Sequence, residues 1–316
     1  MTAAPSRADL QVVASGEFRP RGGRYDVRPL RKRPLRALRG GPRGFAAAFS
    51  LRAGCVEITI LAPPAADREP HSEAEIAWAM TAARGMVAID DDPSEFLAMA
   101  HQHPLVAQLA ARFDCRITRM PTVFEAFARA VIEQLVTTFE ARASIRRLFG
   151  HAGELVDGTV LRAPPTPRAV LDVPPWQLHA MGVGSRRSRT LREGARRGAT
   201  LERLRDVDPA LVVTKLQSLP GVGPWTANLV ARTALGWPDA VPIDDFHAPY
   251  LISEVLTGEQ GDNAAMLDAL APFRPHRARV ERLIMQALIT DQLPGYERLR
   301  RPLPRIDPHR REPWNY

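Results

Sequence analysis

The sequence has few cysteines and no long apolar run. Its 316 residues contain only Cys55 and Cys115, which excludes a disulfide framework, a zinc cluster of cysteines and a four-cysteine iron–sulfur site. No stretch approaches the length of a membrane span, and the first residues lack the apolar core of a signal peptide. We therefore expect a protein of the reducing cytoplasm that has no membrane partner.

Lysine is almost absent as well, since Lys32 and Lys215 are the only two. Arginine therefore carries nearly all of the positive charge, and the formal net charge of the chain is +8. The planar guanidinium group suits phosphate, so this excess of positive charge fits a polyanionic partner. A solvated basic surface without such a partner would have the same net charge. With 45% hydrophobic residues, the chain can bury the core of one large or two ordinary domains.

The first third of the chain predicts a small mixed α/β domain over residues 21–115. Residues 1–20 are polar and show no hydrophobic periodicity, so we expect a flexible tail there. Val56, Ile58 and Ile60 alternate with polar neighbours, as in a strand. Asp92-Pro93-Ser94-Glu95 is typical of a helix start and opens a linking helix. We predict strands at 45–51, 56–61 and 86–89, and a helix at 73–83.

From Thr122 onward the hydrophobic pattern is helical almost to the end. Phe124, Phe127, Val131 and Leu135 follow the spacing of one helix face. We therefore predict an α+β fold in which a mostly helical domain, residues 116–292, follows the small one. The remaining residues, 293–316, are rich in arginine and proline and predict a tail. Further helices are predicted near 177–181, 188–197, 209–218, 225–235, 247–256, 264–271 and 277–290.

The most informative motif is Leu219-Pro220-Gly221-Val222-Gly223. A helix that begins near Pro209 must end at Pro220 and Gly221, because proline cannot donate a hydrogen bond and glycine tolerates a left-handed turn. Pro224 suits the first turn of a new helix. The motif thus predicts two helices joined by a tight hairpin. Free N–H groups at the start of the second helix make an anion site.

Further along the chain comes Val241-Pro242-Ile243-Asp244-Asp245. The hairpin followed by these aspartates resembles the helix–hairpin–helix (HhH-GPD) superfamily of DNA glycosylases. Gly-Val-Gly-x-Trp-Thr-Ala-Asn together with Asp244-Asp245 is most similar to 3-methyladenine DNA glycosylase II, the AlkA type. The resemblance covers about half of the chain, from Pro121 to Leu288. The hairpin alone would also fit an ordinary helical hairpin or a DNA-binding protein without chemistry, and the aspartate at the family's spacing favours the glycosylase.

Removing a base from deoxyribose passes through an oxocarbenium-like transition state, which a nearby carboxylate stabilises. The resemblance gives this catalytic role to Asp245, the second aspartate of the pair and the first residue of Asp245-Phe246-His247. Counting from the hairpin of 8-oxoguanine glycosylases favours Asp244 instead. Either carboxylate could also simply cap the helix that Pro249 predicts.

Bifunctional relatives carry a lysine two residues past the second hairpin glycine, where this chain has Trp225. Lys215 lies before the hairpin, on the wrong side for a Schiff base. We therefore predict a monofunctional enzyme without AP-lyase activity, which leaves an abasic site for a downstream AP endonuclease. The resemblance implies that Trp225 stacks against the extruded base, and packing in the core is the equal alternative.

Glu133-Gln134-Leu135-Val136 resembles the Gly-Gln-Leu-Val segment of AlkA-type enzymes. Leu135 is accordingly the candidate wedge that fills the gap in the DNA stack, with Gln134 beside it in the groove. Glu133 departs from the family's glycine, and a carboxylate so close to DNA is mildly unfavourable. The alternative is that these residues continue a core helix.

The resemblance assigns phosphate binding to the hairpin residues Gly221, Gly223 and Thr226, and contact with phosphate to His247. Family members also hold a monovalent cation, Na⁺ or K⁺, on hairpin carbonyls, and the matching positions are Gln217, Leu219 and Val222. No cofactor is expected for catalysis. The arginines at 186, 187 and 189 either add backbone contacts or form a solvated face.

One departure bears on the substrate. His276 stands where AlkA-type enzymes have a second tryptophan that stacks on cationic alkylated bases, and histidine is a weaker platform. We predict a monomeric enzyme of base excision repair that acts on damaged bases, alkylated purines first, in double-stranded DNA. The alternatives are a glycosylase for oxidised or deaminated bases and a non-catalytic DNA-binding protein.

Overall fold

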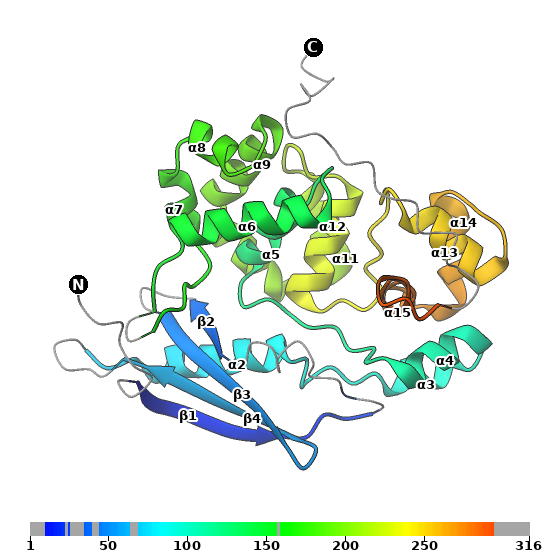
Figure 1. The fold of residues 1–316 in the computed structure, drawn as a ribbon, viewed down its shortest axis with the longest axis horizontal. Helices are drawn as coiled ribbons and strands as arrows, with labels where there is room; N and C mark the ends of the chain where they lie inside the picture. Colours follow the sequence, from blue (N-terminus) through cyan, green and yellow to red (C-terminus); the bar gives the residue numbers. More distant parts are fainter. Residues whose placement is uncertain are drawn as a thin grey trace.

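A four-stranded antiparallel sheet forms one side of the molecule, and helices form the rest (Figure 1). The structure is a computed structural model of the 316-residue chain, and it describes residues 10–22, 25, 35–39, 44–63, 69–156 and 159–293. The predicted α+β class is confirmed.

The sheet has the strand order β1-β4-β3-β2, and its strands are β1 (Gln11–Phe18), β2 (Leu35–Arg39), β3 (Gly44–Arg52) and β4 (Cys55–Ala62). Ala53 and Gly54 join β3 to β4 with φ angles of 48° and 77°, as a two-residue hairpin requires. One face of the sheet packs on α2 (Glu73–Met86) through alternate residues such as Val56 and Ile58. On the other face, Ala46 and Leu61 meet Val156 and Ala163 from the segment after α6 (Thr138–Ala152).

Two of the sequence-based expectations for this part were wrong. Residues 11–18 of the predicted tail form the edge strand β1, which pairs with β4. An edge strand needs little apolar patterning, because only part of each face is covered. Residues 86–89 are a helix end and a turn instead of a strand, with Ala88 at φ 50°. This short apolar run is buried, and periodicity alone cannot tell a buried strand from a buried helix end.

Two hydrophobic cores organise the helices. The larger joins α5 (Val123–Ile132) to the helices that end at η3 (Ala231–Leu235), with Phe127, Leu191 and Val230 inside it. The second joins α3 and α4 to α13, α14 and α15. The linking segment therefore shares its core with the C-terminal helices. The remaining elements run, in chain order, as α3 (Ser94–Ala100), α4 (Pro104–Arg112), α5 (Val123–Ile132), α6 (Thr138–Ala152), α7 (Pro167–Asp172), α8 (Pro175–Ala180), α9 (Ser185–Arg196), α10 (Gly198–Glu202), η2 (Arg203–Asp206), α11 (Pro209–Gln217), α12 (Pro224–Val230), η3 (Ala231–Leu235), α13 (Ala248–Thr257), α14 (Asn263–Leu270), η4 (Ala271–Phe273) and α15 (Arg277–Ile289).

The helices predicted after residue 122 are all present within a few residues of the predicted bounds. The predicted C-terminal tail, residues 293–316, lies outside the described residues except for the buried Leu293. The domain boundary expected near residue 115 stays a prediction. Within the described ranges, no helix combines the length and apolarity needed to cross a membrane.

Candidate active site

The predicted helix–hairpin–helix consists of α11, the turn at residues 218–223, and α12. Asp208 caps α11, because its Oδ1 accepts hydrogen bonds from the N–H groups of Ala210 and Leu211 at 2.9 and 3.4 Å. Gly221 has φ 83° and ends the turn, and Gly223 precedes Pro224 at the first position of α12. The first N–H group of α12 that bonds back to the hairpin is that of Ala227, to Gly223 O at 3.0 Å, so the N–H groups of Trp225 and Thr226 lie outside the helical ladder.

Gly221 is required both by its backbone angle and by its neighbour. A Cβ atom built there would lie 2.0 Å from Thr190 Oγ1 on α9, whereas one built at Gly223 would have nothing within 4 Å. We expect Gly221→Ala to lower the free energy of unfolding by about 2–4 kcal/mol, from the left-handed angle and the steric overlap together. Gly223→Ala, the matched control, should stay within about 1 kcal/mol of the wild type. Urea unfolding measures both, and equal effects of the two changes would contradict this account of the hairpin.

Asp245 lies between the hairpin and the start of α13. Its Oδ2 accepts a hydrogen bond from Trp225 Nε1 at 2.9 Å. Its Oδ1 accepts hydrogen bonds from the N–H groups of His247 at 2.9 Å and of Ala248 at 3.0 Å. The side chain is half-buried. Three donors from two elements therefore fix the orientation of this carboxylate, and the residue caps α13 at the same time.

Asp244 points elsewhere. It is exposed and has φ 67°, an angle that aspartate tolerates better than most residues. Its N–H donates to Asn263 Oδ1 at 3.0 Å, and its Oδ1 accepts from Asn263 Nδ2 at 2.6 Å. These bonds tie Asp244 to the start of α14, so the two aspartates hold different elements.

The segment proposed as a wedge forms a turn between α5 and α6, and the alternative of a continuous core helix was wrong. Leu135 is 81% exposed and has φ 53°, which is rare for a leucine. It therefore leaves the buried face on which Phe124, Phe127 and Val131 lie. Phe139, in the first turn of α6, is 83% exposed as well.

Two side chains fix this turn, one by bonding to the hairpin and α12, the other by bonding from α9 to the end of α5. Gln134 Nε2 donates to Gly221 O at 3.0 Å and to Thr226 Oγ1 at 2.8 Å. Arg187 Nη1 donates to Ile132 O, at the end of α5, at 2.7 Å. The wedge turn and the hairpin are thus one hydrogen-bonded unit. Of the arginine cluster, Arg187 is bound within the protein, whereas Arg186 and Arg189 are exposed.

The other predicted residues have mixed surroundings. Thr226 is buried, and its hydroxyl is already oriented by Gln134. His247 Nδ1 lies in a hydrogen bond with the Tyr250 hydroxyl, and its ring stands edge-on to Phe246, which is 77% exposed.

Among the hairpin carbonyls predicted to bind a cation, Leu219 O accepts from the N–H of Val222 at 3.1 Å. In the part of the chain that the structure describes, no three His, Cys, Asp or Glu side chains gather as a metal site.

His276 lies in the interior instead of on a cleft wall. It is 5% exposed, meets Phe96 edge-on, and has Nε2 3.2 Å from Glu95 Oε2. Its Nδ1 accepts a hydrogen bond from Arg279 Nε at 3.3 Å. These contacts give no support to the predicted stacking on a base. Phe96 and Glu95 come from the linking helix α3, far away in the sequence, so no local pattern could indicate these two contacts.

Sequence reasoning missed three residues that shape the site: Arg187 as a brace of the wedge turn, Asn263 as the partner of Asp244, and the exposed Phe246 beside Asp245. Only Phe246 had a local signal, as the middle residue of Asp-Phe-His. Glu133 is also distinctive, because burial raises its pKa against the lowering effects of Arg129, Arg232 and Arg142.

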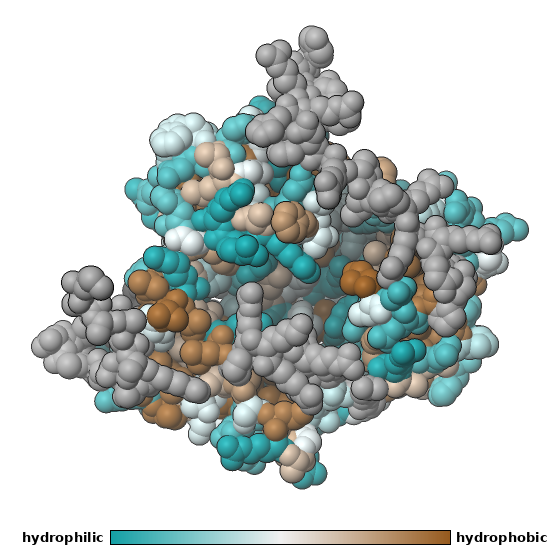
Figure 2. All heavy atoms as spheres, viewed as in Figure 1, coloured by the Kyte–Doolittle hydropathy of each residue, from teal (hydrophilic) through white to brown (hydrophobic). Residues whose placement is uncertain are grey.

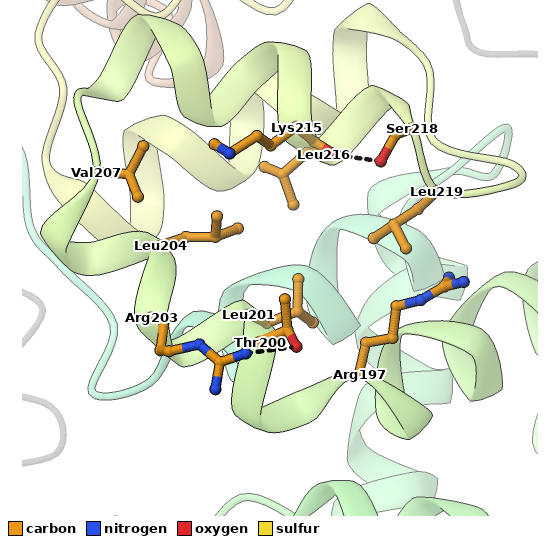
Figure 3. Close-up of a pocket in the computed structure, with 10 residues that line it drawn as sticks. All are labelled: Arg197, Thr200, Leu201, Arg203, Leu204, Val207, Lys215, Leu216, Ser218 and Leu219. Carbon is orange, nitrogen blue, oxygen red and sulfur yellow. Dashed lines mark hydrogen bonds between the residues drawn. The ribbon is translucent and has the colours of Figure 1, made fainter.

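A hollow of about 440 Å³ lies beside α11 and does not include Trp225 or either aspartate (Figure 3). Leucines form much of its wall, and Arg197, Arg203 and Lys215 stand around it. On the face seen in Figure 2, the surface is recessed between the helical bundle and the α13–α14 pair.

Comparisons with known proteins agree with this arrangement. The chain is 30% identical over 168 residues to a probable bifunctional transcriptional activator/DNA repair enzyme AlkA of Mycobacterium tuberculosis. The aligned residues make up 51% of this chain and 33% of that protein. It is 28% identical over 165 residues to a DNA-3-methyladenine glycosylase of Bacillus subtilis, and this alignment makes up 50% of this chain and 54% of that protein. The chain therefore spans about a third to a half of the length of these curated relatives.

In structure, the chain is similar to a 3-methyladenine DNA-glycosylase from Archaeoglobus fulgidus, with a TM-score of 0.71 and 21% identity over 88% of this chain and 99% of that one. No family model matches the sequence. Over about half of its length the chain is thus similar in sequence to 3-methyladenine DNA glycosylases, and it has the fold of the helix–hairpin–helix DNA glycosylases that the hairpin and the paired aspartates predicted.

Proposed function

We propose that this protein is a monofunctional DNA glycosylase of base excision repair, which hydrolyses the N-glycosidic bond of damaged bases in double-stranded DNA. The observation that carries the proposal is the Asp245 carboxylate, which the Trp225 indole holds beside the hairpin. The curated relatives bear the names of DNA-3-methyladenine glycosylases and of a DNA repair enzyme, which makes alkylated purines the leading substrates.

In this proposal Asp245 is the catalytic residue. As the bond between C1′ and the base breaks, positive charge develops on the sugar, and the Asp245 carboxylate stabilises it. A water molecule then attacks C1′ and completes the hydrolysis. The donors from Trp225, His247 and Ala248 hold the carboxylate in one orientation, so that little reorganisation is needed during the reaction.

The hairpin is the proposed grip on the DNA backbone. Gly221 and Gly223 leave the first N–H groups of α12 open to a phosphate, and the net charge of +8 favours the polyanion. The carbonyls of Gln217, Leu219 and Val222 are a donor set that suits a monovalent cation, and Leu219 O retains a second lone pair. Such an ion would supply positive charge next to the phosphate.

Leu135 is the proposed wedge. Its backbone angle is unfavourable, and the turn around it is held by the bond of Gln134 to the hairpin and by the bond of Arg187, on α9, to Ile132. We expect Leu135→Gly to keep or slightly raise the stability, by up to about 1 kcal/mol, because glycine tolerates this angle. Base release from duplex DNA should fall at least tenfold, since nothing fills the gap left by the extruded base. Release from single-stranded DNA, which needs no wedge, should change little. An equal loss on both substrates would contradict the wedge.

The reaction should stop at the abasic site, because Trp225 occupies the position of the lysine that bifunctional relatives use, and the exposed Lys215 lies on the preceding helix α11. Incubation with lesion-bearing duplexes, followed by separate analysis of strands with and without alkali, tests this. Strand cleavage without alkali would contradict the monofunctional assignment. A downstream AP endonuclease would then act on the product, and we propose a monomer in the cytoplasm.

The test of the whole proposal is the release of free base from DNA that contains 3-methyladenine and 7-methylguanine, measured by chromatography. We expect release of at least one of them in single-turnover conditions. Release from a parallel panel with hypoxanthine and 8-oxoguanine, but not from the methylated DNA, would identify the second candidate, a glycosylase for deaminated or oxidised bases. Binding without release from any duplex would leave a DNA-binding protein without chemistry.

A further inference from the structure

The exposed face of α6 carries an aromatic side chain and two arginines. Leu135 and Phe139 are the two most exposed large apolar side chains in the described ranges, and they lie four residues apart. Phe139 is the second residue of α6, and the exposed Arg142 and Arg146 follow it three and seven residues later. This spacing places Phe139, Arg142 and Arg146 on one face of the helix, and we call them the α6 strip. On the face of the molecule seen in Figure 2, strongly hydrophilic side chains gather over the position of α6.

The start of α6 is fixed, so the position of Phe139 is set before any partner binds. The hydroxyl oxygen of Thr137 accepts from the N–H of Glu140 at 3.2 Å, and the Glu140 carboxylate accepts from the N–H of Thr137 at 2.9 Å. Glu140 is the acidic residue of this first turn, and its carboxylate is thus engaged in the cap. On the other side of the helix, Ile145 and Leu148 are buried in the larger core.

The α6 strip begins beside the turn that carries Leu135. Four residues separate Phe139 from Leu135, so their Cα atoms are at most ~14 Å apart, which is about four base steps of a DNA strand. The positive charge of Arg142 acts to lower the pKa of Glu133, two residues before Leu135, so this arginine also stands near the turn. A duplex that receives Leu135 therefore comes within reach of the strip.

Contacts along α9 show on which side of this turn α6 lies. Gly182, before the start of α9, meets α6, because a Cβ atom built there would lie 2.6 Å from Ser144 Oγ. Arg187, in the first turn of α9, donates to the last carbonyl of α5, just before the turn. Thr190, further along α9, lies against Gly221 of the hairpin. The wedge turn therefore lies between the hairpin on one side and α6 on the other.

We propose that the α6 strip binds the undamaged strand of the duplex, and that Phe139 packs against the base opposite the lesion. This inference rests on the proposed glycosylase activity and adds a second point of contact with its substrate. The hairpin lies beside Asp245 and so faces the strand that carries the damaged base. With Leu135 between them, α6 faces the other strand. An aromatic ring stacks on any base, and the two arginines suit the phosphates that flank it.

The first test measures binding to a duplex with a tetrahydrofuran abasic site in one strand, so it does not depend on base release. Opposite that site stands either thymine or a second tetrahydrofuran. Phe139→Ala should raise the Kd for the thymine duplex at least about fivefold, as expected for the loss of one stacked base. Its Kd for the second duplex should stay within about twofold of the wild type, because there is no base to stack on.

The matched control for Phe139→Ala is Trp176→Ala. Trp176 is also an exposed aromatic residue, and it is the second residue of α8 as Phe139 is of α6. Trp176→Ala should bind both duplexes as tightly as the wild type. If Phe139→Ala weakens binding to both duplexes equally, or to neither, the ring does not contact the opposite base and the inference is overturned.

The second test concerns the arginines. Arg142→Gln combined with Arg146→Gln should make the slope of log K against log salt concentration shallower by about 2, since each lost phosphate contact removes about 0.9. The control pair, Arg168→Gln with Arg196→Gln, exchanges exposed arginines of α7 and α9 and should leave the slope unchanged.

Neutral methylphosphonates then identify the strand. Placed in the undamaged strand around the opposite base, they should give the wild type the shallower slope of the double α6 variant. Placed in the damaged strand, they should leave the difference between the two proteins intact. The reverse result would assign the α6 strip to the damaged strand and overturn the inference.

The exchanged side chains are exposed, so the variants are expected to fold as the wild type does. The tests separate this inference from the proposed function. A wild type that releases damaged bases, together with a Phe139→Ala variant that binds both duplexes normally, would contradict the inference alone. A wild type that neither releases a base nor binds any of these duplexes would contradict the proposed function, and the inference with it.

Discussion

Asp245→Asn should reduce the single-turnover rate of base release by at least about a thousandfold. Removal of one preorganised electrostatic group typically costs a factor of 10² to 10³, and here the group carries a full negative charge next to the developing cation. The asparagine keeps an oxygen for the N–H groups of His247 and Ala248, so the start of α13 is preserved. Its amide nitrogen instead faces the Trp225 N–H, where two donors cannot bond.

Asp244→Asn is the matched control for this change. Asp244 is exposed and binds Asn263, and an amide can take the place of the carboxylate in that contact. We expect release within about threefold of the wild type, since a contact remote from the reacting atoms adds little to transition-state stabilisation. Both variants should bind lesion-bearing duplex as tightly as the wild type in a gel-shift titration. Full activity of Asp245→Asn together with an inactive Asp244→Asn would exchange the roles of the two aspartates.

The hairpin could be predicted because its causes are local. Pro220 and Gly221 end one helix, and Pro224 starts the next, whatever surrounds them. For Leu135, the family resemblance predicted a wedge, whereas the hydrophobic spacing predicted a helix that continues through this residue. The helix ends at Ile132. Nothing in the periodicity shows that Arg187, on another helix, binds the carbonyl of Ile132.

Contacts between distant segments were beyond sequence reasoning. Trp225 and Asp245 were both named as site residues, but their hydrogen bond depends on how α12 and the segment before α13 meet in space. His276 was expected to face a base, and it packs instead on Phe96 and beside Glu95, which precede it by most of the chain. The edge strand β1 was missed for a related reason, since its pairing with β4 supplies the order that its own composition does not.

Arg279→Met should lower the free energy of unfolding by about 3–5 kcal/mol, the usual cost of breaking a buried ion pair by removing one partner. Arg279 is 2% exposed and binds both oxygens of Asp91, each at 2.6 Å, and the carbonyl of Cys115 at 3.0 Å. It thereby joins α15 to the turn after α2 and to the linker between the two cores. Methionine fills the volume but leaves Asp91 without its bidentate partner.

The control for Arg279→Met is Arg196→Met, which removes an exposed arginine 3.1 Å from Glu193 and should cost at most about 1 kcal/mol. The double variant Asp91→Asn with Arg279→Met should be more stable than the sum of the single effects indicates, because the second change removes the charge that the first leaves buried. Urea unfolding followed by circular dichroism gives the free energy of unfolding of Arg279→Met, Arg196→Met, Asp91→Asn and the double variant. A loss below 1 kcal/mol for Arg279→Met would contradict the role given to this ion pair. The apolar packing of α3 and α4 on α13–α15 would then be what holds α15 in place.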